Sequence, residues 1–256
     1  MDIVILGSGN AAAVLGRKFH NAGHRIVQVW SRHASSASKL AYEWDTESTN
    51  YISLLSQSAD VYLIAVSDNA IPELAANLRL PGKVVAHTAA SVPASVLATV
   101  TNHYGVLYPL QSLRKENSRL PDIPIYFDGA DSFARTRLQQ LASTVSFDAP
   151  QPADDEQRMR LHVAAVVVNN FVNHLYFLAE QYCRRQGIDF GQLYPLIEET
   201  AVRLKSMSPA MAQTGPAIRH DADTIRKHLD MLSEWPDLKN VYLLMTESIQ
   251  AGRAGV

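Results

Sequence analysis

The sequence predicts an α/β fold, with a doubly wound N-terminal domain over residues 1–150 and an all-α C-terminal domain over residues 151–256. Three observations support this prediction. A glycine-rich loop, GSGNAA, follows the first short apolar run. Further apolar runs alternate with helical segments up to about residue 150. After the segment DAPQPADDEQ, with its two prolines and its acidic run, every periodic segment indicates a helix.

The composition allows two packed domains and excludes several classes of partner. The chain has 256 residues, of which 47% are hydrophobic and 19% charged, so a sizeable core can form. Its net charge of −2 offers no basic surface for nucleic acid or anionic membranes. The single cysteine, Cys183, cannot form an internal disulfide and favours a reducing compartment. The apolar run before the glycines is too short for a signal peptide, so we expect a cytoplasmic protein, and we expect no metal site.

Apolar runs of strand length predict a parallel sheet in the N-terminal domain. Several are continuous rather than alternating, as in strands that are buried on both faces. The runs cover residues 3–6, 25–30, 61–66, 83–87, 106–108, 123–127 and 145–147. Helices are predicted between them at 11–22, ended by Gly23, and at 71–78, with Pro72 in the first turn. In the C-terminal domain, helices are predicted at 155–186, 190–205, 224–233 and 238–252.

The loop GSGNAA has the spacing of a Rossmann-like dinucleotide site. Gly7 permits a tight turn, Gly9 leaves room for a pyrophosphate, and Ala12 allows close packing of helix on sheet. The following helix presents its free amides to the anion. We therefore predict that the cofactor contacts the loop residues Gly7, Ser8, Gly9, Asn10 and Ala11.

The residues after the second predicted strand decide which cofactor is expected. An acidic residue that binds the ribose 2′-hydroxyl is usual there, whereas this chain has Ser31 and Arg32. An arginine can bind a 2′-phosphate through its guanidinium group, so we predict NADP(H). The alternative is that Arg32 is a solvated surface residue.

Polar residues follow the next two strands, at the sheet edge where ligands of open α/β folds bind. Val66, Ser67 and Asp68 are predicted to lie beside the cofactor, and so is Thr88. His87 is placed near the nicotinamide as a candidate catalytic residue. Asp68 could instead cap a helix, and His87 could be a buried structural histidine.

Apolar residues occupy every face of the predicted helix over 163–168. A membrane span would need ~20 apolar residues, and Asn169, Asn170, Asn173 and His174 interrupt the run too early. A helix of this kind must be covered on all sides, and one chain has too few other predicted helices to cover it. We therefore expect a homodimer built by the C-terminal half, with an interface beyond ~2,000 Å².

These residues resemble a known family. The first half resembles the NADP-binding domains of pyrroline-5-carboxylate reductases and of deazaflavin-linked NADP oxidoreductases. Nearly the whole chain resembles oxidoreductases in which a Rossmann-like domain precedes a helical domain of unknown function. The resemblance is carried by GSGNAA, AVSDNAI, His87-Thr88, YPLQS, LHVAAVVVNNF and TGPAIRHD. Pyrroline-5-carboxylate reductases pair through these helices, which also implies a homodimer.

The chain departs from the pattern of its relatives at three places. Ala89-Ala90 stands where Ser-Gly is usual, Tyr108 where histidine is usual before Pro-Leu-Gln, and His220 where glycine is usual between arginine and aspartate.

The helical half supplies further candidate catalytic residues. His162, Asn169 and Asn173 fall at i, i+7 and i+11 on one helix face. Such a polar face needs partners, which a substrate, a nicotinamide amide or another helix could provide. In the second motif, Thr214 offers a hydroxyl and Arg219 a carboxylate-binding fork. Alternatively, this motif is an interhelical turn followed by a capping aspartate, Asp221 or Asp223.

Together these features predict an NADP(H)-dependent oxidoreductase that transfers a hydride between NADPH and a small carbonyl or imine compound. The candidate catalytic residues are His162, Asn170, Thr214, Arg219 and His87. One alternative is a non-catalytic NADP-binding sensor, because no strong acid–base signature is present. Another is a deazaflavin-to-NADP hydride exchanger, although the sequence shows no second phosphate-binding loop.

Overall fold

The computed structural model describes residues 1–252, and the chain forms two compact units. The first unit covers Met1–Asn170, and the second begins at Phe171. The predicted domain boundary at residue 150 precedes the last strand of the sheet, at Gln151–Pro152, so the C-terminal domain predicted to be all-α begins with two strand residues. The compact units divide 20 residues after that boundary.

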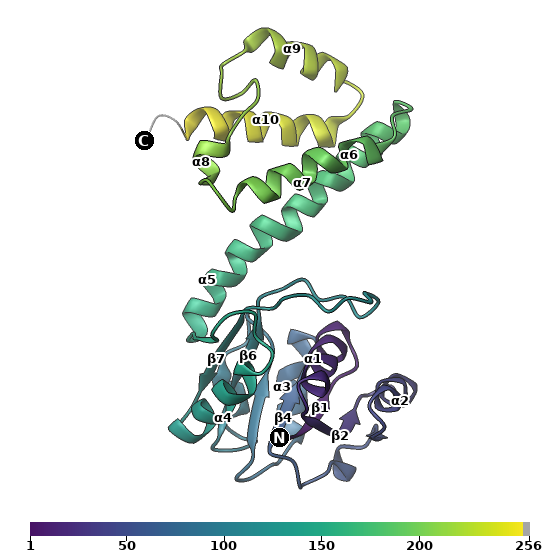
Figure 1. The fold of residues 1–256 in the computed structure, drawn as a ribbon, viewed down its shortest axis with the longest axis vertical. Coiled ribbons are helices and arrows are strands. Elements are labelled where there is room, and N and C mark those ends of the chain that lie inside the picture. The colour runs from purple at the N-terminus through teal and green to yellow at the C-terminus, as the bar shows by residue number, and fades with distance from the viewer. Residues whose placement is uncertain (253–256) are drawn as a thin grey trace. The chain divides into compact units, whose positions relative to one another are not determined.

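The first unit contains one eight-stranded sheet in the order β3-β2-β1-β4-β5-β6-β7-β8 (Figure 1). Its strands are β1 (Asp2–Leu6), β2 (Arg25–Trp30), β3 (Glu47–Thr49), β4 (Val61–Ile64), β5 (Val84–His87), β6 (Tyr104–Pro109), β7 (Ile125–Gly129) and β8 (Gln151–Pro152). The first six run parallel, β7 pairs antiparallel with β6, and β8 runs parallel to β7. The order reverses between β1 and β4, the switch point of a doubly wound sheet. The predicted α/β class is confirmed.

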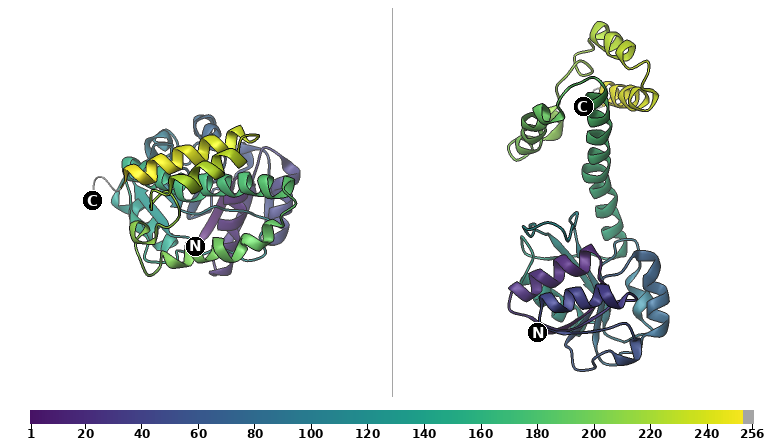
Figure 2. Two further views of the ribbon diagram at one scale, coloured as in Figure 1. Left: turned by 90° about the horizontal axis from the view of Figure 1, so that it is seen from above. Right: turned by 90° about the vertical axis from the view of Figure 1, so that its right-hand side faces the viewer.

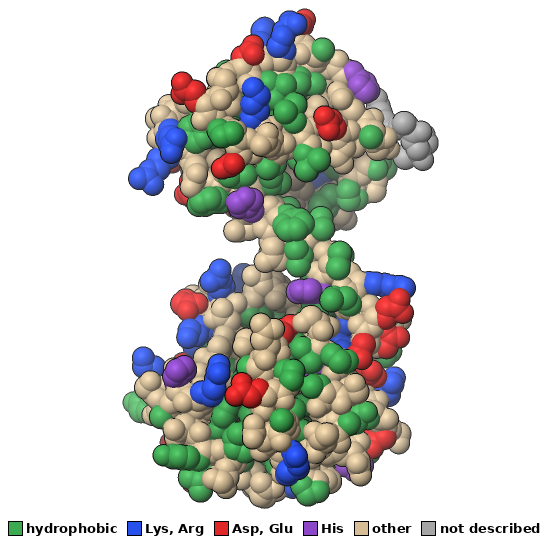
Figure 3. Space-filling view, turned by 180° about the vertical axis from the view of Figure 1, so that it is seen from behind, with side chains coloured by type: hydrophobic (Ala, Val, Ile, Leu, Met, Phe, Trp, Pro, Cys, Tyr) green, Lys and Arg blue, Asp and Glu red, His purple; other side chains and the backbone are tan. Residues whose placement is uncertain are grey.

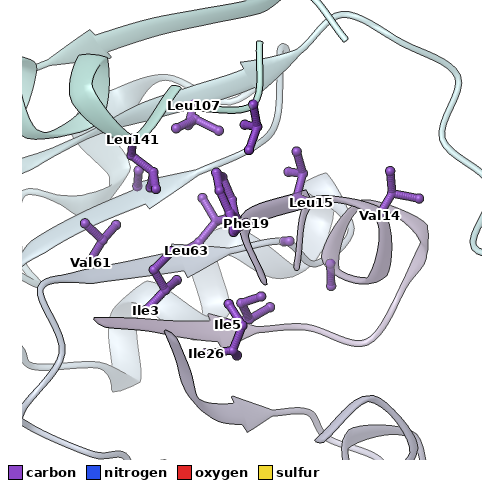
Figure 4. Close-up of a cluster of buried hydrophobic side chains, with 14 of the residues drawn as sticks. Ile3, Ile5, Val14, Leu15, Phe19, Ile26, Val61, Leu63, Leu107 and Leu141 are labelled. Atoms are coloured by element: carbon purple, nitrogen blue, oxygen red, sulfur yellow. The ribbon is translucent and has the colours of Figure 1, made fainter. Parts of the chain in front are cut away.

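Helices cover both faces of this sheet because its strands are apolar on both sides. Ile3 and Ile5 of β1 pack into one buried cluster with α1 (Asn10–Asn21) and α4 (Ser132–Ser143) (Figure 4). Val4 and Leu6 point to the other face, where they pack with α3 (Ile71–Asn77). The remaining helices of this unit are α2 (Ala34–Glu43) and α5 (Asp155–Ala165). The strands β1, β4 and β5 are therefore packed between helices on both faces of the sheet.

One predicted strand is wrong, and several elements were not predicted. Residues 145–147 form no strand, because the amides of Val145 and Ser146 donate to the Ala142 carbonyl and end α4. The helix α4 has a polar sequence with weak apolar periodicity, the helix α2 was not predicted although its sequence is amphipathic, and β3 spans only three residues. Such elements are stabilised mainly by the sheet on which they pack.

The second unit is helical, as predicted (Figure 2). Its helices are α6 (Val172–Arg185), α7 (Tyr194–Arg203), α8 (Pro209–Ala212), α9 (Ala222–Met231) and α10 (Pro236–Ala251). Asp221 caps α9, since its carboxylate accepts a hydrogen bond from the amide of Thr224. The structure thus selects Asp221 from the two aspartates proposed as caps.

A π-helical segment, Val166–Phe171, lies between α5 and α6. The helical stretch Asp155–Arg185 has 31 residues and, in its most apolar part, a mean hydropathy of 1.3, so by length and composition it could cross a membrane. The core helix of a soluble protein has the same properties. Large apolar side chains along it are exposed in the single chain, Val168 to 70% and Phe171 to 59%. Figure 3 shows that hydrophobic side chains also reach the surface of the second unit.

Candidate functional site

The loop between β1 and α1 has the geometry of a pyrophosphate site. The Gly7 amide donates to the Trp30 carbonyl at 2.7 Å. Its φ is +137°, and a Cβ there would lie 2.2 Å from the Ala65 carbonyl oxygen, so only glycine fits between β1 and β4. A Cβ on Gly9 would meet no atom within 4 Å. The space above Gly9 is therefore open to a ligand.

The first turn of α1 can bind an anion in that space. Gly9 is its N-cap, and no side chain within residues 1–252 caps this helix end. The amides of the first turn are thus free to bind phosphate oxygens. Ser8 and Ser31 lie next to each other, with their hydroxyl oxygens 2.8 Å apart. The loop residues therefore fit the pyrophosphate of a dinucleotide.

A cavity of about 210 Å³ lies at the end of β2, and Arg32 is part of its wall. Its other lining residues include Trp30, Val66, Glu73 and Leu74. Arg32 is exposed, whereas Trp30 is buried. An apolar slot beside a guanidinium group suits an adenine ring together with the 2′-phosphate of the adjoining ribose. Arg32 and Val66 thus lie in the wall of one cavity, and their roles in cofactor binding stay predictions.

A second cavity, of about 600 Å³, lies where β4, β5 and β6 end. We refer to it as the strand-end cavity. Asp68 follows β4, Thr88 follows β5, and Gln111 follows β6, while α5 and the π-helical segment form the opposite wall. The polar side chains that line it are Asp68, Thr88, Tyr108, Gln111, Ser112, His162, Asn169 and Asn170. The apolar ones are Ala89, Ala90, Pro109, Leu110, Leu161, Ala164, Ala165 and Val168.

Tyr108 and His162 face each other in this cavity. The phenol oxygen of Tyr108 lies 3.3 Å from Nδ1 of His162, and the two rings meet edge to face. Burial raises the pKa of Tyr108, and the negative charge of Asp68 raises it further. Asp68 accepts a hydrogen bond from the Ser91 hydroxyl and is the first residue of a short helical turn whose N-cap position is Ser67. The phenol therefore keeps its proton over the ordinary pH range.

Arg158 attaches α5, which forms one wall of the strand-end cavity, to the rest of the first unit. This residue was not identified from the sequence. The residue is fully buried. Its guanidinium group donates to the carbonyls of Ala153 and Val92 and to the carboxylate of Asp155. The same carboxylate accepts from the amide of Ala94, so the first turn of α5 is joined to the loop after β5. Nothing in the stretch QRMRLH distinguishes the buried arginine from its neighbour.

His87 lies beneath the strand-end cavity rather than in its wall. The residue is fully buried, and its Nδ1 accepts from the amide of Ala89 at 3.2 Å. Burial, reinforced by the positive charge of Arg158, lowers the pKa of His87 to about 4, so the imidazole is neutral at pH 7. Of the residues that the structure describes, His87 is not one that lines the cavity. This placement favours the alternative that His87 is a buried structural histidine rather than a catalytic residue.

The structure brings together only some of the candidate catalytic residues. His162, Asn169 and Asn170 line the same cavity, and both asparagines belong to the π-helical segment. Asn173 lies in α6. Thr214 and Arg219 belong to the second unit, between α8 and α9, and their catalytic roles stay predictions. Ser67 begins the turn after β4.

Two family models match the chain. Residues 2–91 match the model described as NADP oxidoreductase, coenzyme F420-dependent. Residues 123–249 match a domain of unknown function, DUF2520. A search of curated proteins finds no match.

Solved structures resemble the chain over its whole length. A candidate NADP oxidoreductase from Bacteroides fragilis is 37% identical, with a TM-score of 0.89 over 98% of both chains. A reductive aminase from Aspergillus terreus, in complex with NADPH and ethyl-5-oxohexanoate, is 16% identical, with a TM-score of 0.72 over 99% of this chain and 94% of its own. A 1-pyrroline-5-carboxylate reductase from Streptococcus pyogenes is 14% identical, with a TM-score of 0.63 over 98% of both. The last two show a shared fold alone.

Proposed function

Because the chain belongs to the family in which an NADP oxidoreductase domain is joined to a DUF2520 domain, we propose that it transfers a hydride between NADP(H) and a small carbonyl or imine compound. The observation that carries this proposal is the strand-end cavity. It lies at the carboxyl ends of the central strands, where doubly wound folds bind the reactive part of a dinucleotide.

The cofactor would be held by residues of the first unit. The amides at the start of α1 bind the pyrophosphate over Gly9, and Arg32 binds the 2′-phosphate. When bound, NADPH supplies the hydride. Residues of the strand-end cavity then orient the acceptor, with the Asn169 and Asn170 amides and the Thr88 hydroxyl as hydrogen-bonding groups.

The acceptor class is supported by the similar structures. The Aspergillus terreus enzyme is named a reductive aminase and is seen with a keto ester, and the Streptococcus pyogenes enzyme is named for a cyclic imine. A carbonyl and an imine place the same demands on a site, because both need a hydride at carbon and a proton at the adjacent heteroatom.

Binding titrations test the cofactor. NADPH is expected to bind at least about tenfold more tightly than NADH, since a charge-assisted hydrogen bond contributes ~1.5–3 kcal/mol. Arg32→Asp should abolish or invert this preference. Arg119→Asp, an identical charge change on the exposed loop after β6, serves as the control and should leave it unchanged. Equal affinity of the native protein for both cofactors would refute the assignment.

A turnover assay tests the reaction and separates the alternatives. NADPH oxidation is followed with panels of ketones, keto acids and imines, each with and without an added amine. Steady oxidation with any of them supports the reductase, whereas tight binding with no turnover supports a sensor. The deazaflavin is included because the N-terminal family model is described as coenzyme F420-dependent. Hydride exchange with the deazaflavin alone would replace the carbonyl or imine assignment.

A further inference from the structure

We infer that Tyr108 donates the proton that accompanies hydride transfer, and that His162 resupplies it. This inference rests on the proposed function. It assigns the acid of the reaction to a residue of β6.

The geometry of the pair supports a direct proton path. Both side chains line the strand-end cavity, and the Tyr108 oxygen lies 3.3 Å from His162 Nδ1. Tyr108 is only 7% exposed, so its hydroxyl has few competing water molecules. His162 is partly exposed, so its imidazole can exchange protons with solvent.

The other lining groups are poorer proton donors. In the part of the chain that the structure describes, Asp68 is the one other ionisable residue of the cavity wall. It already accepts a hydrogen bond from the Ser91 hydroxyl, which occupies one oxygen of its carboxyl group. Thr88, Ser112 and the amide side chains hydrogen-bond to a substrate but do not ionise in the physiological range.

The surroundings of Tyr108 favour the protonated form of its phenol before the reaction. Burial and the charge of Asp68 raise the pKa of the phenol, as does Tyr126 on the neighbouring strand, while Arg158 acts in the opposite direction. The net effect is a neutral phenol. Such a group is a hydrogen-bond donor in the ground state and an acid when negative charge develops on the acceptor.

The step balances as follows. The hydride forms the new C–H bond while the π electrons of the C=O or C=N group move to its heteroatom. That heteroatom takes the proton of Tyr108, and the O–H bond of the phenol breaks. The phenolate takes the Nδ1 proton of protonated His162, which becomes neutral and regains a proton from water. In the reverse direction the phenolate accepts the substrate proton.

The test combines two phenylalanine variants in the intact protein. Tyr108→Phe keeps the ring but removes the acid, so kcat for the best acceptor should fall about 10²–10⁴-fold. The NADPH dissociation constant, measured by titration, should change less than about twofold, because the cofactor contacts assigned above do not involve the phenol. Tyr104→Phe is the matched control, since Tyr104 lies on the same strand β6 but does not line the strand-end cavity, and its kcat should stay unchanged.

A second variant separates proton supply from structure. His162→Gln retains a hydrogen-bonding side chain but cannot carry a proton. It should lower kcat and remove one ionisation from the pH profile of kcat, while the thermal midpoint moves little. A purely structural role would lower the thermal midpoint and leave the shape of that profile unchanged.

The outcomes distinguish the inference from the proposed function. If the native protein oxidises NADPH and Tyr108→Phe is equally active, Tyr108 is not the donor, although the reductase assignment stands. If the native protein binds NADPH but reduces no acceptor, both are overturned.

Discussion

His87 links the stability of the first unit to pH, because its imidazole is buried and neutral. Its pKa is lowered from 6.5 to about 4, so between these values the unfolded chain binds a proton that the folded chain does not. Stability from this residue is complete above pH 6.5 and is lost as the pH falls toward 4. At 1.36 kcal/mol per pKa unit, the loss amounts to about 3 kcal/mol.

Urea unfolding at several pH values between 7.5 and 4 measures this dependence. His87→Gln is expected to be less stable at neutral pH, but its free energy of unfolding should fall less steeply over the same range. Carboxylates contribute equally to both proteins and cancel in the comparison. Parallel pH curves for the two would show that His87 is not the source.

The backbone conformation at His220 bears on one of the three departures from the pattern of the relatives. Its φ is +55°, in the left-handed region where glycine is favoured and other residues are strained. A glycine, which the resemblance described above implies at this position, would adopt this conformation without strain.

At the scale of elements, the attachment of α5 depends on Arg158. Replacing this arginine with methionine leaves the carbonyls of Ala153 and Val92 without their donor and Asp155 without its ion pair. Arg158→Met should lower the free energy of unfolding by about 2–4 kcal/mol. Arg160→Met is the control, because its ion pair with Glu156 is exposed, and it should cost less than about 1 kcal/mol. Equal losses in chemical denaturation would contradict this role.

The π-helical segment contributes part of the wall of the strand-end cavity. Asn169 and Asn170 both belong to this segment and both line the strand-end cavity. Single π-helical turns inside α-helices are often found at functional sites.

For the whole molecule, we propose a homodimer formed through the helical half. Val167, Val168, Phe171 and Phe177 are each at least 47% exposed in the single chain. A surface of this kind requires cover by apolar groups, and a two-fold partner is the commonest solution. Light scattering at micromolar concentration should give twice the mass of one 28.2 kDa chain.

Two other results would contradict this proposal. A mass equal to one chain would leave the helix to be covered in another way. Recovery of the native protein in the membrane fraction, with release only by detergent, would show that the stretch Asp155–Arg185 meets lipid rather than a second copy. A high-salt wash distinguishes this from peripheral binding.

The sequence by itself determined the α/β class, the position of the glycine loop and the family. These depend on local properties: the apolar runs of β1, β2, β4 and β5, and the spacing of Gly7, Gly9 and Ala12 in the loop after the first run. The helical character of the second half was predictable for the same reason, because the spacing of its apolar residues follows the period of an α-helix.

Only the tertiary structure decided which residues share the candidate site. Tyr108 and His162 are 54 residues apart in the chain, and no local pattern shows that β6 and α5 meet. Arg158 and Arg160 are alike in sequence, yet one is fully buried and the other exposed, because packing against the loop after β5 selects one helix face. His87 was a plausible catalytic residue by position along its strand, but the depth at which its side chain lies depends on the layers packed above it.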